Sequence, residues 1–256
     1  MFTRAIVRPP GASYAAGLTS STEGVPDLGR AIAQHHEYCN ALRECGLSVH
    51  ALQPDERYPD GTFVEDTAVI SGAMAVVTRP GAPSREGEIQ GLAALLQGFG
   101  LSVEEITAPG SVDGGDICQI EKHFLIGLSH RTNAEGARQL ARILERYGYS
   151  SSEIDIRNNK ALLHLKSGLS YLGENRLLVV PDLIVPEQLS RYQLISVSAE
   201  EGYAANCVRI NDRVLVAAGY PRLSASLERL GYSALALPMS EFRKMDGGLS
   251  CLSLRF

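Results

Sequence analysis

Short stretches of alternating apolar and polar residues recur along the chain, and most of them occur as pairs joined by a tight turn. The clearest pair is FVEDTAVISGAMAVVTRPG, in which two extended segments flank Ser71-Gly72 and a Pro-Gly stop follows. Alternation of this length is typical of half-buried β-strands. Three similar pairs are predicted in VDGGDICQIEKHFLIGLS, in Leu162–Leu172 with Arg176–Val180, and in AANCVRINDRVLVAAG.

Between these pairs the apolar residues are spaced by three and four positions, which predicts amphipathic helices. The first helix is expected to begin after Asp27, a favoured capping residue, and to end at Gly46. Further elements follow from the same patterns: helices over Arg85–Phe99, Asn133–Tyr147 and Arg222–Leu230, and single strands at Thr3–Val7, Leu47–Leu52 and Ser102–Ile106.

The strand pairs recur with a regular period. They begin near Asp66, Asp116, His164 and Asn206, and a last strand begins near Cys251, which gives a period of roughly 42 to 50 residues. A period of this size is typical of propellers and solenoids. Helices between the strand pairs exclude an all-β propeller.

The two ends of the chain complete this pattern. The fifth unit has a single strand, Leu249–Arg255, and Thr3–Val7 is available to pair with it. We therefore expect an α/β fold with one domain over residues 1–256, built as a ring of five ββαβ units and closed by pairing of the terminal strands. Closure leaves no exposed edge. An open α/β sheet is the alternative, because strands and helices alternate there too.

Composition and charge narrow the classes of function. Hydrophobic residues make up 45% of the 256 residues, and the net charge is −5 without a basic block, so neither nucleic acid nor an anionic membrane is an expected partner. No apolar run is long enough for a signal peptide or a membrane span. The five cysteines include no CxxC, which disfavours a disulfide scaffold and a zinc site and favours a reduced, cytoplasmic protein. The oligomeric state is left open, with a homodimer among the options.

Ionisable and polar residues lie at or beside the beginning of the first strand of each pair. In a ring of such units, these first strands begin near one another at one end of the central axis. A cysteine nucleophile needs a base or a cationic neighbour, and a histidine acid or base needs a group that orients it. Clustered carboxylates repel one another unless a cation is present, and a planar guanidinium ligand is well suited to pair with them. Taken singly, the cysteine and the histidine are better explained as core residues and the aspartates as turn residues. Only their convergence favours catalysis by this set: Glu65, Asp66, Asp113, Asp116, His164, Asn206 and Cys251.

Six motifs, FVEDTAV, VDGGDICQI, GLSHRTNAEGARQL, LHLKSG, AANCV and DGGLSC, together resemble the dimethylarginine dimethylaminohydrolases over essentially the whole chain. The resemblance implies a five-bladed ββαβ propeller, or pentein, and hydrolysis of methylated arginine to citrulline without a metal or an organic cofactor. Arginine deiminases share this core, so activity on unmethylated arginine is the alternative among enzymes. A non-catalytic binding protein is the alternative from another class, since a ribosome anti-association factor has a similar ring.

The resemblance also implies roles for individual residues. Cys251 resembles the family nucleophile, which forms a covalent S-alkylthiouronium intermediate, and His164 resembles the general acid and base. Asp113 matches the carboxylate that partners the histidine. The glycine pair before Cys251 is interpreted as allowing a flat ligand to approach the backbone. The implied substrate contacts are Asp66 and Glu65 at the guanidinium, Arg85 and Arg131 at the carboxylate, Leu18 and Asp60 at the amino group, and the main chain of Met245.

Overall fold

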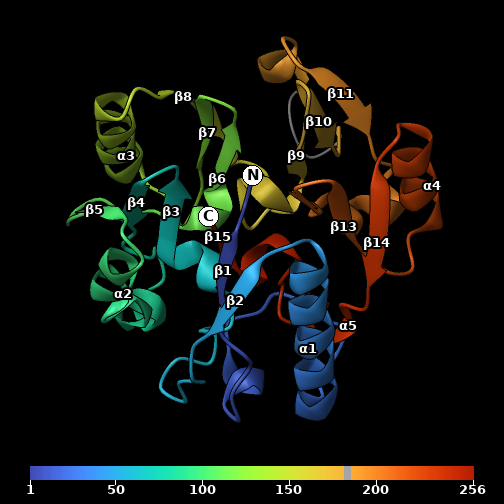
Figure 1. The fold of residues 1–256 in the computed structure, drawn as a ribbon, viewed down its shortest axis with the longest axis horizontal. Helices are drawn as coiled ribbons and strands as arrows, with labels where there is room; N and C mark the ends of the chain where they lie inside the picture. The colour runs from blue at the N-terminus through green and yellow to red at the C-terminus, as the bar shows by residue number, and fades with distance from the viewer. Residues whose placement is uncertain (182–185) are drawn as a thin grey trace.

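The computed structural model describes residues 1–181 and 186–256, and their strands form five separate three-stranded sheets around a common centre (Figure 1). One sheet has the order β15-β1-β2 and joins the two ends of the chain. The strands in chain order are β1 (Arg4–Val7), β2 (Ser48–Ala51), β3 (Ala68–Ser71), β4 (Met74–Val77), β5 (Ser102–Glu105), β6 (Ile117–Ile120), β7 (His123–Leu128), β8 (Ser150–Asp155), β9 (Leu169–Gly173), β10 (Arg176–Val179), β11 (Gln193–Ser196), β12 (Val208–Ile210), β13 (Arg213–Ala217), β14 (Ser233–Leu237) and β15 (Leu254–Arg255).

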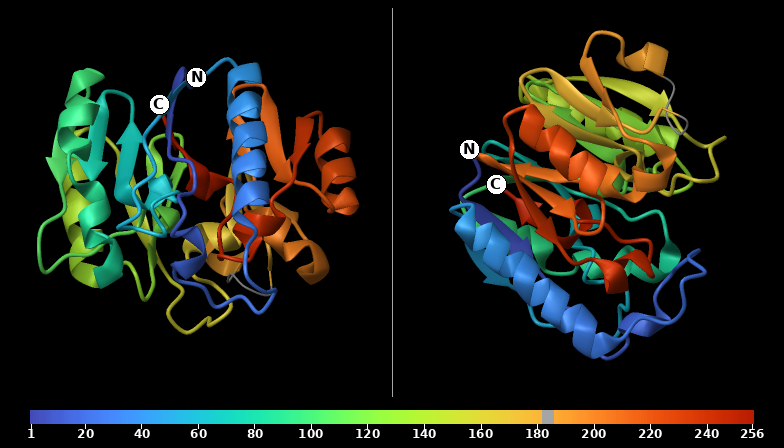
Figure 2. Two further views of the ribbon diagram at one scale, coloured as in Figure 1. Left: turned by 90° about the horizontal axis from the view of Figure 1, so that it is seen from below. Right: turned by 90° about the vertical axis from the view of Figure 1, so that its right-hand side faces the viewer.

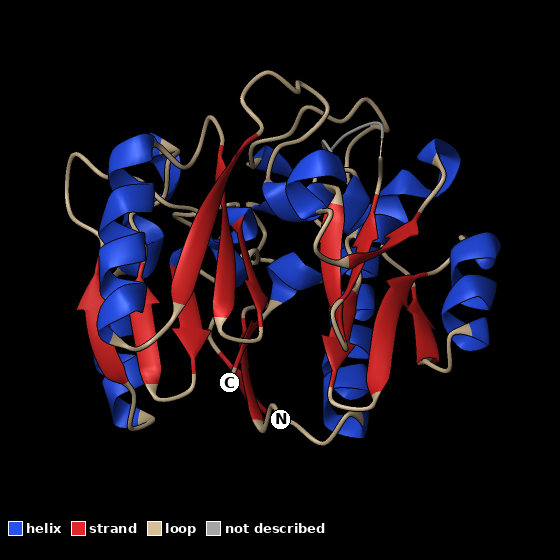
Figure 3. Ribbon diagram, turned by 90° about the horizontal axis from the view of Figure 1, so that it is seen from above, coloured by secondary structure: helices blue, strands red, loops and turns tan. Residues whose placement is uncertain are grey.

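Every sheet repeats one plan. Its leading strand pairs antiparallel with the central strand, and the third strand pairs parallel with that central strand. The parallel step requires a crossover, which helices provide in four of the units. These helices lie outside the strands (Figures 1 and 3), and they are α1 (Leu28–Glu44), α2 (Leu92–Gly98), α3 (Ala134–Arg146) and α4 (Pro221–Arg229). In the fourth unit the described part of the crossover contains a short 3₁₀ helix, η6 (Pro186–Leu189). The predicted ring of five ββαβ units is confirmed.

The terminal strands close the ring as predicted. Ala5 pairs with Arg255 and Ile6 with Leu254 in an antiparallel ladder between β1 and β15. The chain ends consequently lie side by side (Figure 2). This pairing ties down a C-terminus that would otherwise fray.

Capping signals in the sequence set the helix ends. The Asp27 side chain accepts a hydrogen bond from Arg30 N–H at the start of α1, and Asn133 accepts one from Gly136 N–H at the start of α3. The apolar face of α3 packs on its own sheet, for example Leu140 against the cluster that contains Phe124. None of the described helices is long and apolar enough to cross a membrane.

The predicted helix over Arg85–Phe99 is wrong in its extent. A 3₁₀ helix, η3 (Pro83–Ile89), is followed by the separate helix α2, and Gly91 between them has a φ of 76°. A backbone in that left-handed region cannot continue a right-handed helix, and glycine adopts it at low cost. The spacing of apolar residues therefore identified the side that packs on the core, including Leu92 and Leu96, but it did not reveal the interruption at Gly91.

The leading strands begin later than predicted, because a 3₁₀ helix precedes each of them. Leu249–Arg255 is not a continuous strand, since Cys251 lies on such a helix and only Leu254–Arg255 is extended. Leu162–Leu172 is divided in the same way. These five segments, called here the entry turns, are η2 (Val64–Thr67), η4 (Gly114–Asp116), η5 (Leu165–Ser167), η7 (Ala199–Ala205) and η8 (Ser250–Leu252).

Candidate active site

The five entry turns meet at the centre of the ring. Turn η2 contacts η8 and η4, η4 contacts η5, and η5 contacts η7. The packing is close: a Cβ on Gly114 would lie 2.0 Å from the carbonyl oxygen of Glu65. The prediction that the beginnings of these strands converge is thus confirmed. A small cavity of about 60 Å³ lies among the turns and is lined by Gly115, His164, Lys166, Ser167, Tyr203, Asn206, Asp246, Gly247, Gly248, Ser250 and Cys251.

Cys251 is the half-buried cysteine, whereas Cys39, Cys45, Cys118 and Cys207 are buried. Its sulfur accepts a hydrogen bond from Gly248 N–H at 3.4 Å. Burial, followed by the charges of Glu65 and Asp66, raises the pKa of the Cys251 thiol to about 12, although Gly248 N–H and Lys166 act in the opposite direction. The sulfur is therefore protonated in the free protein, and a cation at the carboxylates favours its ionisation.

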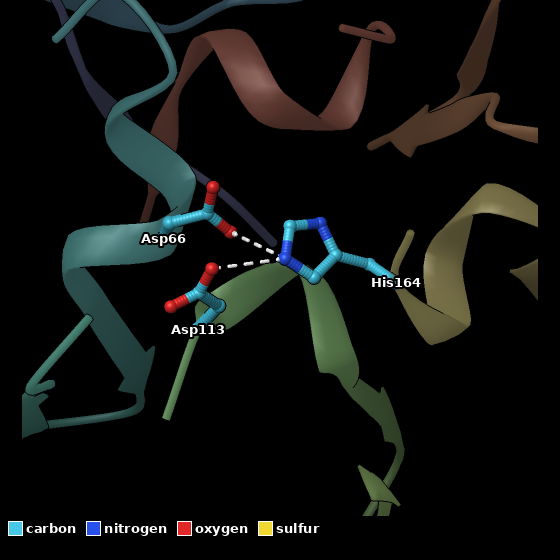
Figure 4. Close-up of side chains that lie close together, drawn as sticks. All are labelled: Asp66, Asp113 and His164. Carbon is cyan, nitrogen blue, oxygen red and sulfur yellow. Dashed lines mark hydrogen bonds and ion pairs between the residues drawn. The ribbon is translucent and has the colours of Figure 1, made fainter. Parts of the chain in front are cut away.

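One ring nitrogen of His164 faces two carboxylates, as Figure 4 shows. Its Nε2 atom is 3.0 Å from Asp113 Oδ2 and 4.0 Å from Asp66 Oδ1, and all three side chains are buried. Burial alone would lower the pKa of His164, but Asp66, Asp113 and Asp116 outweigh it and raise that pKa to about 9. The imidazole is thus protonated at neutral pH and can donate a proton. A Cβ on Gly115 would lie 2.6 Å from His164 Nδ1, which explains the glycine in this motif.

The two carboxylates are held by donors from the protein. Asp113 Oδ1 accepts a hydrogen bond from Gly81 N–H at 2.8 Å, and Asp66 Oδ1 accepts one from Gly115 N–H at 2.8 Å. Burial acts to raise the pKa of Asp113, yet His164 and the Arg85 charge hold it below its usual value. Donor atoms of His164 and the two aspartates lie within 4.8 Å of one another, a spacing that suits a metal ion. Arg85 already supplies a cation to Asp66 at 2.6 Å.

The two predicted carboxylate-binding arginines differ in their surroundings. Arg85 is buried, donates to Glu88 through Nε and Nη2, and donates to Asp66 and to the carbonyl of Phe63. Its donors are therefore engaged by Glu88, Asp66 and backbone carbonyls of the protein. Arg131, in contrast, has a buried Nη1 atom without a hydrogen-bond partner among the described residues. Arg131 is therefore the better placed of the two to bind an anionic group.

Leu18 and Asp60, both predicted near the substrate amino group, lie together, and the Met245 side chain lies beside them. Leu18 N–H donates to both carboxylate oxygens of Asp60 at 3.0 and 3.2 Å. A Cβ on Gly17 would lie 2.6 Å from Asp60 Oδ1 and 3.1 Å from the terminal carbon of Met245. Burial raises the pKa of Asp60, although Arg85, Leu18 N–H and Arg131 oppose this effect. Leu18 itself is 43% exposed and forms the outer edge of this group.

Both carboxylate oxygens of Glu65 are bound by other side chains of the protein. One of its oxygens accepts from Lys166 at 2.6 Å and Arg255 at 2.9 Å, and the other accepts from the Ser250 hydroxyl at 2.6 Å. These groups also line a second cavity of about 660 Å³, whose wall includes Cys118. Glu65 is thus held by ion pairs within the protein, its contact with a guanidinium stays a prediction, and its charge acts on Cys251 through space.

Two further side chains bind the backbone on either side of Gly248, close to Cys251. Asn206, whose role the sequence left open, accepts from Ser250 N–H at 2.9 Å and donates to the Ser250 hydroxyl and the Lys166 carbonyl. Tyr203, which sequence reasoning missed, donates to the Gly247 carbonyl at 2.8 Å. No local pattern marks this tyrosine, because its partner is 44 residues away.

The glycine pair before Cys251 packs tightly against other side chains. A Cβ on Gly247 would lie 2.2 Å from the Phe63 ring, and one on Gly248 would lie 2.5 Å from Asn206. Both glycines are thus required by the packing of the protein itself, and the approach of a flat ligand stays a prediction. Asp116, the other motif residue left open, accepts from the Ser129 hydroxyl and from Leu165 N–H, and so joins the entry turns η4 and η5.

Known proteins share this architecture and sequence. Residues 99–213 match the arginine deiminase family model. The chain is 46% identical over 257 residues to the N(G),N(G)-dimethylarginine dimethylaminohydrolase of Pseudomonas aeruginosa, with all of both chains covered, and 33% identical to the Streptomyces coelicolor protein of that name, with 98% and 96% covered. The solved structure of the Pseudomonas protein, as a cysteine-to-serine variant with citrulline, matches with a TM-score of 0.96 and complete coverage of both chains. On this full-length identity, the chain belongs to the dimethylarginine dimethylaminohydrolase family.

Proposed function

We propose that this protein hydrolyses Nω,Nω-dimethyl-L-arginine, and also Nω-monomethyl-L-arginine, to L-citrulline and the corresponding methylated amine. One observation carries the proposal: Cys251 lines the same small cavity as His164, which is paired with Asp113 and Asp66. A half-buried thiol, a protonated imidazole and buried carboxylates suit a cationic amidine substrate. The activity named for the Pseudomonas relative supports this reading.

Substrate binding follows from the charges around the cavity. The guanidinium is a planar cation, and Asp66 and Asp113 offer it oxygens beside His164. The free Nη1 donor of Arg131 suits the substrate carboxylate. Asp60 is the acceptor for the α-amino group, with Leu18 N–H and the terminal carbon of Met245 beside it, and the main chain of Met245 is a further predicted contact. Because these contacts span almost the whole sequence, we treat residues 1–256 as one catalytic domain.

In the first half of the reaction, the bound guanidinium offsets the carboxylate charges that disfavour the thiolate, and the Cys251 proton leaves to solvent. The thiolate attacks the central guanidinium carbon. His164, protonated at neutral pH, donates its proton to the departing dimethylamine as the carbon–nitrogen bond breaks. The product of this half is an S-alkylthiouronium on Cys251.

The second half returns the enzyme to its starting state. Neutral His164 takes a proton from a water molecule, whose oxygen attacks the same carbon. The carbon–sulfur bond breaks, the proton remaining on the water-derived oxygen passes to the Cys251 sulfur, and neutral citrulline is released from the regenerated thiol. Asp113 and Asp66 favour the imidazolium formed in this step, since their charges already raise the pKa of His164.

The proposal is tested by comparing methylated and unmethylated substrates. The expected kcat/KM for citrulline formation is at least about tenfold higher for dimethylarginine than for arginine, because a site shaped for two methyl groups loses apolar contact with the smaller substrate. The match of residues 99–213 to arginine deiminase favours the alternative activity. An equal or higher kcat/KM for arginine would establish that alternative.

Alkylation separates an enzyme from a non-catalytic binding protein on the same ring. Iodoacetamide should modify Cys251 before the other four cysteines, because those are buried. The rate should keep rising above pH 9, since the pKa of the thiol is about 12. An unreactive arginine analogue should protect the site, as measured by mass spectrometry of the labelled peptides. Equal, slow labelling of all five cysteines would favour the binding protein.

A further inference from the structure

The peptide unit between Gly247 and Gly248, close to Cys251, makes a hydrogen bond through its carbonyl and another through its N–H. The Tyr203 hydroxyl donates to the Gly247 carbonyl at 2.8 Å, and Gly248 N–H donates to the Cys251 sulfur at 3.4 Å. This carbonyl and this N–H belong to the same peptide bond, and in a trans peptide they point in opposite directions. Tyr203 therefore holds the far side of the group that contacts the sulfur.

The orientation of this peptide depends on a hydrogen-bond partner from outside the local backbone. Glycines lie on both sides of it, so its plane can rotate at low cost. The neighbouring peptides are fixed by the backbone: Gly247 N–H donates to the Phe242 carbonyl at 2.9 Å, and Cys251 N–H donates to the Gly248 carbonyl at 3.2 Å. For the Gly247 carbonyl the corresponding partner is a side chain, the Tyr203 hydroxyl.

Tyr203 is itself well fixed for this role. It lies on the entry turn η7, which is followed by Asn206, the residue that holds Ser250. The Arg243 guanidinium lies 5.6 Å from the centre of the Tyr203 ring, and the Tyr220 ring packs against it at 5.9 Å. Burial, and then the nearby Cys251, raise the pKa of Tyr203 well above its usual range, so the hydroxyl stays a donor.

We propose that Tyr203 is a positioning residue for the nucleophile: its hydroxyl orients the Gly247–Gly248 peptide so that Gly248 N–H remains directed at the Cys251 sulfur as that sulfur becomes negative. A donor on the carbonyl also polarises the peptide and strengthens its N–H as a hydrogen-bond donor. The catalytic consequence rests on the proposed function. The orientation of the peptide does not, since it is a property of the free protein.

The test is Tyr203→Phe, which removes the hydroxyl and keeps the ring. We expect alkylation of Cys251 by iodoacetamide at a fixed pH between about 7 and 9 to slow by roughly five- to tenfold, the worth of one hydrogen bond to the sulfur. The kcat for dimethylarginine should fall by a similar factor with KM little changed, because Tyr203 acts on the sulfur. Tyr232→Phe is the matched control: this tyrosine is also buried, but its hydroxyl accepts from Arg176 and it does not line the small cavity, so alkylation should be unchanged.

Several results would overturn the assignment. One is a folded Tyr203→Phe protein, with the melting temperature of the parent, in which Cys251 is alkylated at the parental rate. Another is an increase in KM alone, which would make Tyr203 a substrate contact. In the unmodified protein, the Gly248 amide signal in NMR should exchange slowly with solvent at neutral pH. A rapidly exchanging signal would refute the role without any variant. Because alkylation and exchange need no substrate, absent turnover of every arginine would refute only the proposed function.

Discussion

Replacing Cys251 with serine should reduce citrulline formation from dimethylarginine by roughly 10⁴-fold or more. A serine hydroxyl ionises far less readily than a thiol, and the bound guanidinium that favours a thiolate cannot shift a hydroxyl far enough. The fold should persist, because serine is slightly smaller than cysteine and the half-buried side chain has one hydrogen bond, from Gly248 N–H. The measurements are citrulline release and the melting temperature.

A second cysteine provides the control for this change. Cys45→Ser alters a buried thiol at the end of α1, away from the small cavity, and should leave turnover unchanged. Substantial turnover by folded Cys251→Ser would remove the covalent mechanism. Equal loss in both variants would point to destabilisation instead of lost chemistry.

Replacing His164 with glycine should lower kcat by about 10³-fold, which is within the range that a positioned acid and base contributes. The pKa of His164, about 9, keeps the imidazole protonated at neutral pH, so the parent enzyme has a proton ready for the leaving amine. As the pH rises through about 9 this proton is lost, and kcat/KM of the parent should decrease on that account. In His164→Gly that alkaline decrease should disappear, as a pH profile of kcat/KM will show.

The two steps assigned to His164 can be separated by the leaving group. A substrate that releases a weakly basic thiolate needs no proton donor in the first step, so His164→Gly should form the S-alkylthiouronium readily and hydrolyse it slowly. Mass spectrometry should then detect the adduct on Cys251. His123→Gln is the control. It changes an imidazole that is hydrogen-bonded to Ser150 and Ser152 away from the small cavity, and it should behave as the parent does. Parental rates for both steps in His164→Gly would exclude the histidine from acid–base catalysis.

The sequence by itself predicted the ring that the structure confirms, and it supplied the residues that we propose to react. Period-2 alternation marks strands locally, and its recurrence every 42 to 50 residues or so revealed the units before any contact was known. The unpaired strand at each end predicted closure, which the pairing of Ile6 with Leu254 realises. Asp27 and Asn133 predicted helix starts because capping acts over three residues, within reach of local pattern.

Only the tertiary structure decided how the side chains of the site are paired. Glu65 and Arg255 are 190 residues apart in sequence, and they meet because closure of the ring brings the entry turns together. Arg85 binds Asp66, 19 residues away in the same unit, although its motif position implied a substrate contact. Hydrogen bonds across the ring depend on the distances and directions that all five units fix jointly, and no local spacing encodes them. The hold of Tyr203 on the peptide beside Cys251 belongs to this class, which is why it emerged from the geometry and not from the motifs.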